Sequence, residues 1–558
     1  MKKNFFLRCI APVTLILVLG SCSDASKRMS DLLEHVPSDA EGVFVANVRT
    51  IVESSGGTIE ESRLRLPSYL EDMMGRSDTE FISFIEDSGV DMDAIALFGD
   101  FDESYSVILF SLQDKDKFID AIEDEKFREK DVDDGVSYYV KEDDRSYGTY
   151  YDYIAIIGDY AYYIENVWGE SDFNAKRKLR RSIEAADKES FAETGFYGFV
   201  TQGNLAGGYL KIPGEAKREF RRAGLGSEIE DLLDGVVCMN SNITDNALNV
   251  RFKLLDANGD EMDTSEIYKH FDSNAKINPA ALAYLGNNDI LVYGISMKDY
   301  DWDYYFDQFG NAAGMSRSDM AVMAIVKSYL EKFDGTLVIG AGLANGKESI
   351  YKLGLDNEKD VMGEISFTMV METKSGKAKG IINDIRALLD SQGLYYENDR
   401  DGLALKFPDW NASIYVKADN DMVIVSNSDI DARDGNATVD NIKFENYFAA
   451  AGLVLSKQDK LAEDFNLDEG LKTLLTYDLT TLEASLDFIV DGDGSKGLIE
   501  TIADAIIDDI QPEAERISER WIEYYDSRYD SAIEAVPYDS SDEYYSVEES
   551  SDSVAVAE

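Results

Sequence analysis

Carboxylates dominate the candidate chemistry of this sequence: Asp and Glu number 109, against 54 Lys and Arg, in 558 residues. Glycoside hydrolysis needs two carboxylates at a defined separation in a cleft, acting as acid and as base or nucleophile. Here carboxylates are spread along the whole chain, so their spacing singles out no such pair. We therefore assign no catalytic residue, and an envelope hydrolase that uses unidentified carboxylates stays the alternative to a binding protein.

Basic residues gather in two segments of the first half, and both segments have a helical pattern. A cluster of cations could bind an anion, for example the phosphates of an outer-membrane glycolipid. The alternative, which we favour, is pairing with the protein's own excess of carboxylates. The candidate anion-binding residues are Lys176, Arg177, Lys178, Arg180, Arg181, Lys217, Arg218, Arg221 and Arg222.

Aromatic residues cluster once in each half, close to carboxylates. Exposed rings could stack on sugars while the carboxylates bind sugar hydroxyls. Aromatic residues are also strand formers whose alternate members face a core, and packing is the interpretation we favour. The candidate aromatic binding face comprises Tyr150, Tyr151, Tyr153, Trp302, Tyr304 and Tyr305.

The other polar motifs indicate structure rather than chemistry. Asp256–Glu261 and Asp491–Ser495 space oxygen donors as a hard cation prefers, but both lack the glycine and glutamate of a calcium loop. Since both follow a strand, we interpret them as turns. Cys238 lies in an apolar strand with no nearby histidine, which indicates a buried, inert thiol. We expect no metal and no cofactor.

The formal net charge of −55 and a pI of about 4.2 narrow the choice of partners. Nucleic acid is excluded, because binding it requires clustered cations that neutralise phosphates. Docking on anionic lipid through a basic face is disfavoured for the same reason.

The N-terminus resembles the signal of a bacterial lipoprotein. Three basic residues precede an apolar stretch of eleven residues, 9–19, which is too short to span a membrane. Leu19-Gly20-Ser21-Cys22 then resembles a lipoprotein box. The resemblance implies cleavage after Ser21 and lipid on the Cys22 sulfur, with an ordinary signal peptide as the alternative. Ser23 favours the outer membrane, facing either the periplasm or the cell surface.

The rest of the chain shows the same order of predicted elements twice. In each half a strand after a proline is followed by a helix and strand, an outward strand, another helix, a run of three strands and a closing strand. We therefore predict an internal duplication over 36–262 and 279–497, with two unrelated domains as the alternative. Residues 258–278 are polar and rich in turn residues, which suits a seam between the halves.

These patterns predict an α+β protein made of two tandem, similarly ordered domains. Consecutive strands indicate largely antiparallel sheets, with helices on one face. We expect a signal peptide at 1–21, a tether at 22–35, C-terminal helices at 498–535 and a disordered acidic tail at 536–558.

The lipoprotein box, the acidity and Pro37-Ser38-Asp39-Ala40 before the first strand resemble an uncharacterised family of gut-bacterial lipoproteins of the Bacteroidota type. These proteins have about five hundred residues and are catalogued as a domain of unknown function. The resemblance implies location and fold but no reaction. We expect a lipid-anchored envelope protein with a non-enzymatic binding or scaffold role. Its partners would be the membrane, through Cys22, and a glycan or another envelope protein.

Overall fold

The computed structural model describes residues 25–498 except for 61–62, 68–85, 87, 101–104, 146–147, 165–171, 215–216, 219–231, 245, 266–268, 305, 307–323, 325, 344–364, 400, 408–411, 429, 431–434, 456–469 and 491–497. The predicted signal peptide, Ser21 and Cys22 lie outside the described residues. So do the predicted C-terminal helices beyond Leu498 and the acidic tail.

The first half of the described chain supplies ten strands of the main sheet. They are β1 (Gly42–Asn47), β4 (Val90–Asp100), β5 (Tyr105–Leu112), β6 (Arg128–Asp133), β7 (Val136–Arg145), β8 (Gly148–Ile157), β9 (Tyr160–Ile164), β10 (Ala206–Lys211), β11 (Val236–Ile243) and β12 (Ala247–Leu255). Between them lie α2 (Ala25–Leu33), α3 (Val48–Ser54), α6 (Lys115–Asp124), α7 (Asp172–Ala186), η1 (Phe191–Glu193), α8 (Tyr197–Val200) and the small hairpin β2 (Thr58–Glu60) and β3 (Arg63–Arg65).

The second half of the described chain supplies another ten strands. They are β13 (Leu291–Ser296), β14 (Phe333–Leu343), β15 (Ile365–Thr373), β16 (Glu397–Asp399), β17 (Gly402–Phe407), β18 (Ala412–Asp419), β19 (Met422–Ser426), β20 (Ala449–Leu455), β21 (Leu471–Asp478) and β22 (Glu483–Val490). The helices are α12 (Pro279–Leu282), α16 (Ala378–Gln392), α17 (Ala437–Asn441) and η5 (Phe444–Asn446).

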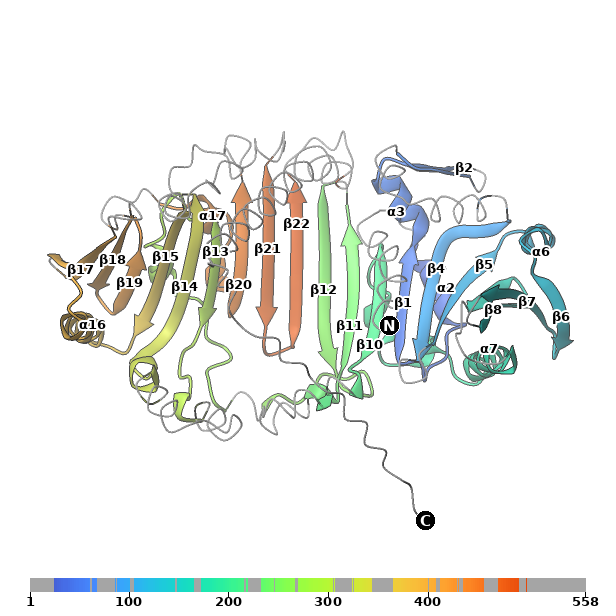
Figure 1. Cartoon of the computed structure of the whole chain (residues 1–558), viewed down its shortest axis with the longest axis horizontal. Coiled ribbons are helices and arrows are strands. Elements are labelled where there is room, and N and C mark those ends of the chain that lie inside the picture. The colour runs from blue at the N-terminus through green and yellow to red at the C-terminus, as the bar shows by residue number, and fades with distance from the viewer. Residues whose placement is uncertain are drawn as a thin grey trace, which may run out of the picture. The chain divides into compact units, whose positions relative to one another are not determined.

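All twenty strands pair in one sheet within the described residues, and every pairing is antiparallel. The predictions of an α+β class and of antiparallel sheets are therefore confirmed. From one edge to the other the strand order is β6, β7, β8, β9, β5, β4, β1, β10, β11, β12, β22, β21, β20, β13, β14, β15, β19, β18, β17 and β16 (Figure 1).

The strand order is the same in both directions outward from the β12–β22 pair. β11, β10, β1, β4 and β5 follow on one side, and β21, β20, β13, β14 and β15 follow on the other. Helix α6 comes after β5 in the chain, as α16 comes after β15. The pairing of β12 with β22 joins the halves in one sheet, and all of the described residues belong to one compact unit.

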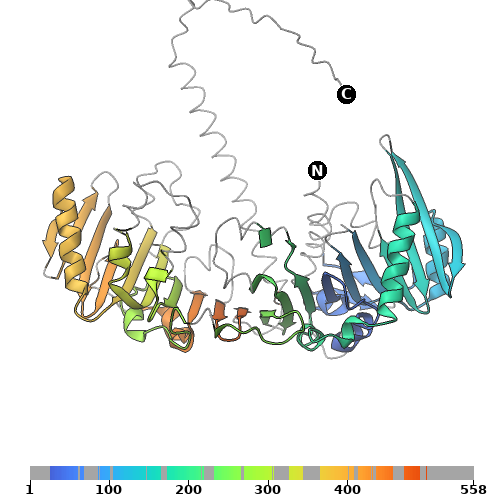
Figure 2. The same ribbon diagram turned by 90° about the horizontal axis from the view of Figure 1, so that it is seen from below.

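Helices cover both faces of the sheet, so the prediction of helices on one face is wrong. On β8, Tyr153 and Ala155 pack in one core with α2 and α7, whereas Ile154 and Ile156 pack in another with α6. Neighbouring residues of a strand point to opposite sides. Both sides of these strands are apolar, and each side therefore needs its own cover. In Figure 2 the strands in the middle of the sheet are seen nearly end-on, whereas the teal strands of the first half are seen lengthwise.

A packed helix occupies most of the segment that the sequence predicts to be a tether. Helix α2 begins at Ala25, and its residues Met29, Leu32 and Leu33 are at most 2% exposed in the core with Val43. Only Ser23 and Asp24 separate Cys22 from this helix. The prediction of a tether over 22–35 is therefore wrong for the residues of α2. The apolar side chains of this helix are separated by polar residues in the sequence, and only the helical spacing brings them together on one buried side.

Candidate functional site

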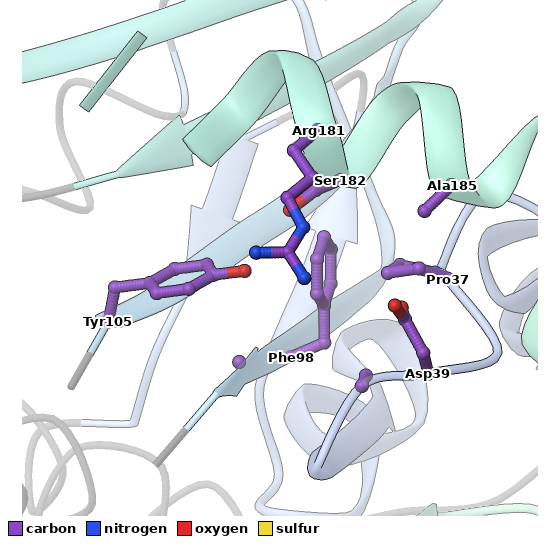
Figure 3. A pocket seen from close by; sticks show the side chains of 9 residues that line it. Pro37, Asp39, Phe98, Tyr105, Arg181, Ser182 and Ala185 are labelled. Atoms are coloured by element: carbon purple, nitrogen blue, oxygen red, sulfur yellow. The ribbon is translucent and has the colours of Figure 1, made fainter. Parts of the chain in front are cut away.

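A small pocket lies beside α7, next to the Pro37–Ala40 segment. Figure 3 shows the Arg181 guanidinium between the Tyr105 hydroxyl and the Phe98 ring, with the Asp39 carboxylate nearby. The cavity volume is about 30 Å³, room for two or three water molecules, since each needs about 10–15 Å³ by this measure. The pocket is therefore too small to hold a sugar ring.

The structure pairs several of the candidate anion-binding residues with carboxylates. Lys176 Nζ lies 2.6 Å from Asp131, Arg180 lies 2.9 Å from Asp133 and 2.7 Å from Glu184, and Lys217 lies 2.9 Å from Asp234. Lys178 is buried, with its Nζ 4.8 Å from the centre of the Tyr105 ring. Arg177, Arg181 and Arg218 also have interaction partners, and Arg221 and Arg222 lie outside the described residues.

The candidate aromatic residues do not come together. Tyr150, Tyr151 and Tyr153 are on β8, and Trp302 and Tyr304 follow β13, which lies eleven positions away in the strand order. Tyr153 is fully buried, and Tyr304 stacks on His270 with ring centres 3.5 Å apart. The side chain of Tyr150 and all of Tyr305 lie outside the described residues. These rings therefore form no shared sugar-binding surface in the described structure.

Of the two motifs that the sequence predicts to be turns, 256–261 is described and 491–495 lies outside the described residues. The Asp256 carboxylate accepts from the backbone N–H groups of Asn258 and Asp260 at 2.8 and 2.9 Å, which holds its pKa below the usual value. This is the geometry of a turn, as predicted. Cys238 is a fully buried free cysteine, also as predicted, and burial raises the pKa of its thiol to about 12.

A larger surface, not foreseen from the sequence, covers one side of eight consecutive strands. We call it the apolar face and define it by alternate positions whose registers place them on one side of β10, β11, β12, β22, β21, β20, β13 and β14. Its members are Gly208, Leu210, Val237, Met239, Ser241, Val250, Phe252, Ala484, Leu486, Phe488, Thr473, Leu475, Tyr477, Ala449, Ala451, Leu453, Leu291, Tyr293, Ile295, Leu337, Ile339 and Ala341.

The apolar face is half exposed along its length. The most exposed large side chains are Leu291 at 51%, Leu475 at 45%, Leu210 at 40%, Phe252 at 39%, and Tyr293, Ile339 and Tyr477 at 38% each. On the opposite side of the same strands, Tyr209, Cys238, Val292 and Val338 are at most 4% exposed. The opposite side is thus closed at β10, β11, β13 and β14, whereas the side that forms the apolar face is partly exposed.

Charged residues avoid the apolar face. In the described strands that form it, every Arg, Lys, Asp and Glu occupies an alternate position on the other side. There Arg251 pairs with Glu483, and the Asn249 amide donates to Asp487 at 2.5 Å. The described strands of the apolar face thus place no charged residue on it, in a chain in which 29% of the residues are charged.

The hydroxyl groups on the apolar face lie in apolar surroundings. Burial raises the pKa of Tyr293 and of Tyr477 above the ordinary tyrosine value. Ser241 and Thr473 are the remaining hydroxyls among its described residues. The face therefore offers dispersion and hydrophobic contact but few directional bonds.

Comparison with known proteins gives no functional information. No family model and no curated protein matches the chain. Solved structures that resemble part of it include crystal form III of TP0453, at 14% identity over 44% of this chain and 88% of that one, with a TM-score of 0.23. Crystal form I of TP0453 matches at 13% identity over 45% and 82%, with the same TM-score. Similarity this low supports no argument about function.

In the part of the chain that the structure describes, every helix is too short or too polar to cross a lipid bilayer.

Proposed function

We propose that this protein is a lipid-anchored protein of the outer membrane, facing the periplasm or the cell surface, with a non-enzymatic binding role. The anchor would be diacylglycerol on Cys22 after removal of residues 1–21. Two or three acyl chains at about 0.8 kcal/mol per buried CH₂ would hold the protein on the membrane almost permanently. The same N-terminal residues support its place among the lipoproteins it resembles.

The apolar face is the observation that carries the binding role. A monomeric soluble protein rarely exposes a contiguous apolar patch of more than a few hundred Å². Here the patch extends over eight strands, and the charged residues of β12, β21 and β22 all face the other way. In a binding or scaffold protein, such a face is the surface that contacts the partner.

The alternative of an envelope hydrolase finds less support. The pocket beside α7 has a single carboxylate, Asp39, among its described lining residues. Retaining and inverting glycosidases need two carboxylates that face each other across a space for a sugar. The small volume of this pocket and the burial of Tyr153 also weigh against a glycan partner.

We further propose that residues 36–262 and 279–497 are two copies of one ancestral unit. The identical strand order on either side of the β12–β22 pair supports this interpretation. Joining the two units through β12 and β22 would extend the apolar face across both of them, because a paired edge strand continues the side-chain alternation of its neighbour.

Fractionation of cells that express the full chain tests the anchor. With Cys22→Ala, the protein should leave the membrane fraction and should lose incorporation of labelled palmitate. Cys238→Ala is the matched control, because this buried cysteine should leave both properties unchanged. Membrane association and palmitate labelling that persist in Cys22→Ala would refute the anchor. Protease treatment of intact cells would then show which side of the outer membrane the protein faces.

A further inference from the structure

We propose that the apolar face binds the acyl chains of a membrane lipid, so that this protein holds a diacyl lipid against its sheet. The inference rests on the proposed envelope location and adds the chemical class of the ligand. Seven exposed side chains define the binding region: Leu210, Phe252, Leu291, Tyr293, Ile339, Leu475 and Tyr477.

The dimensions of the face suit a lipid. Eight strands at about 4.8 Å spacing span about 34 Å. The hydrocarbon of one bilayer leaflet is about 15 Å thick, half of a core of about 30 Å. An extended acyl chain can therefore lie on the face across several strands, with side chains beneath its whole length.

Within the sheet, the apolar face ends where other elements cover the same side of the strands. Beyond β10 the same side continues through Ala46 on β1 and Ile95 on β4 to Phe110 on β5, where α6 packs and Phe118 lies 5.6 Å from the Phe110 ring. Beyond β14 it continues to Met371 on β15, which packs against α16. At one end of the strands, Ile51, Leu66 and Leu498 cover Leu248, Val250 and Phe488. The seven exposed residues lie between these elements, in the region that the described helices and loops leave uncovered.

The backbone of the eight strands cannot form hydrogen bonds to a protein partner. Each of the eight strands is paired on both sides, so its N–H and C=O groups are already used in the ladders. A protein interface of about 1,600 Å² carries roughly ten hydrogen bonds, whereas this face has few hydroxyls and no charged group among its described residues. An acyl chain needs no such bonds.

Charge disfavours a second copy of the chain as the occupant. Each molecule has a formal net charge of −55, and face-to-face docking would bring two such charges together. A lipid whose acyl chains lie on the face adds little charge there, because its polar group can remain at the edge in water.

The helix that follows the predicted anchor packs on the side of the sheet opposite the apolar face. Helix α2 packs in the core with Val43 and Val45, whereas the apolar face continues through the side of β1 that carries Phe44 and Ala46. Cys22 lies three residues before this helix. We therefore assign the face to a separate membrane lipid and not to the lipid attached at Cys22.

Photo-crosslinking of the full chain in cell membranes tests this assignment directly. p-Benzoyl-phenylalanine replaces Leu291 or Leu475 on the face, and Leu388 on α16 serves as the matched control because it is 55% exposed outside the face. After irradiation, mass spectrometry should find the mass of a diacyl lipid on the peptides containing positions 291 and 475. The peptide containing position 388 should have at least tenfold less adduct.

Every other adduct contradicts the assignment. A crosslinked homodimer would assign the face to a second copy, and a crosslink to residues 499–558 would assign it to the chain's own C-terminal segment. A crosslink to the Cys22 peptide would assign it to the anchor, and one to another protein would make it a protein interface. Lipid adducts that are equal at positions 291 and 388 would indicate only general contact with the membrane.

Charge substitutions provide a second measurement. Leu291→Glu and Leu475→Glu should reduce the lipid that copurifies with the protein at least tenfold, and Leu388→Glu should leave it unchanged. Unchanged copurification in the two face variants would overturn the proposal. Because membrane anchoring through Cys22 is measured separately, by fractionation and palmitate labelling, loss of the anchor and loss of lipid on the face are distinguishable.

Discussion

Arg251 on β12 donates from Nε to the Glu483 carboxylate on β22 at 2.7 Å, and its Nη2 also donates to the same oxygen. The two residues are 232 positions apart in the chain and lie on the strands that join its halves. The Arg251 guanidinium also lies 5.7 Å from the centre of the Phe199 ring. This pair therefore connects the first half of the sheet to the second on the side opposite the apolar face.

Replacing one partner should weaken the junction measurably. The Arg251 and Glu483 side chains are 37% and 21% exposed, so solvent screens the pair only in part. We expect Glu483→Gln to lower the free energy of unfolding by about 1 kcal/mol. Denaturant unfolding measures the change. Asp272→Asn, which breaks the more exposed Lys298–Asp272 pair at 3.3 Å, should change it by less than about 0.5 kcal/mol. Equal effects of both substitutions would show that the junction pair has no special role.

Two neighbouring glycines on β10 should differ sharply in their tolerance of a methyl group. A Cβ at Gly207 would collide with the backbone oxygen of Val200 on α8 and with its side chain. A Cβ at Gly208, which points to the apolar face, would meet Met239 and Phe44 at 3.5 and 3.6 Å, which is ordinary contact.

We therefore expect Gly207→Ala to destabilise the protein by about 1–3 kcal/mol, and Gly208→Ala to change its stability by less than about 0.5 kcal/mol. Thermal or denaturant unfolding of both variants provides the comparison. A Gly208→Ala variant as unstable as Gly207→Ala would mean that the apolar face is closely covered in solution, which would also weaken the binding proposal.

The sequence predicts the strands whose residues are β-branched or aromatic, and the structure confirms them. The two predicted runs of three strands, VSYYV, YIAII and AYYIE in the first half and LALKF, SIYVK and MVIVS in the second, correspond to β7, β8, β9, β17, β18 and β19. The sequence does not reveal β6 and β16. These two strands are the edges of the sheet, and their sequences are REKDVD and END. Charged side chains protect an edge from unwanted pairing, and the same charges remove the hydrophobic signal of a strand.

The apolar face could have been suspected from the sequence but not located. β12 and β22 alternate polar or charged residues with apolar ones, as in LNVRFKL of β12, which indicates strands with one polar side. Alternation alone does not show which side a helix or loop will cover. The strand order decides this, because only the pairing of β12 with β22 brings residues such as Phe252 and Ala484 together on one surface. That pairing joins segments more than 200 residues apart.

Helix α2 should behave as part of the folded body and not as a tether. Leu33 is fully buried, so Leu33→Ala should cost about 2–5 kcal/mol of the free energy of unfolding. Lys27 on the same helix is exposed, and Lys27→Ala should change stability by less than about 0.5 kcal/mol. Limited proteolysis offers a second measurement, since the wild-type chain should resist cleavage between residues 27 and 35. Rapid cleavage there would mean that the segment is a free linker after all.

One core of the first half contains several ionisable groups that are kept neutral. Burial raises the pKa of Tyr138 and of Cys238 to about 12 each, and raises the pKa of Tyr162 and of Tyr209 further. The Tyr162 hydroxyl donates a hydrogen bond to the His35 carbonyl oxygen at 3.1 Å. This bond requires the proton, so it stabilises the neutral form of the side chain.

These shifts predict that the protein loses stability in alkaline solution. The groups ionise near pH 9 for cysteine and pH 10 for tyrosine when the chain is unfolded, but only near pH 12 or above when it is folded. The folded state therefore keeps protons that the unfolded state releases, so stability is full below about pH 9 and falls as the pH rises toward 12. Denaturant unfolding at pH 8, 10 and 11, with tyrosinate absorbance recorded in parallel, measures the loss. Tyr138→Phe should make the fall with pH shallower, because it removes one of the groups. Constant stability up to pH 11, or ionisation of all tyrosines near pH 10 without unfolding, would show that this core is open to water.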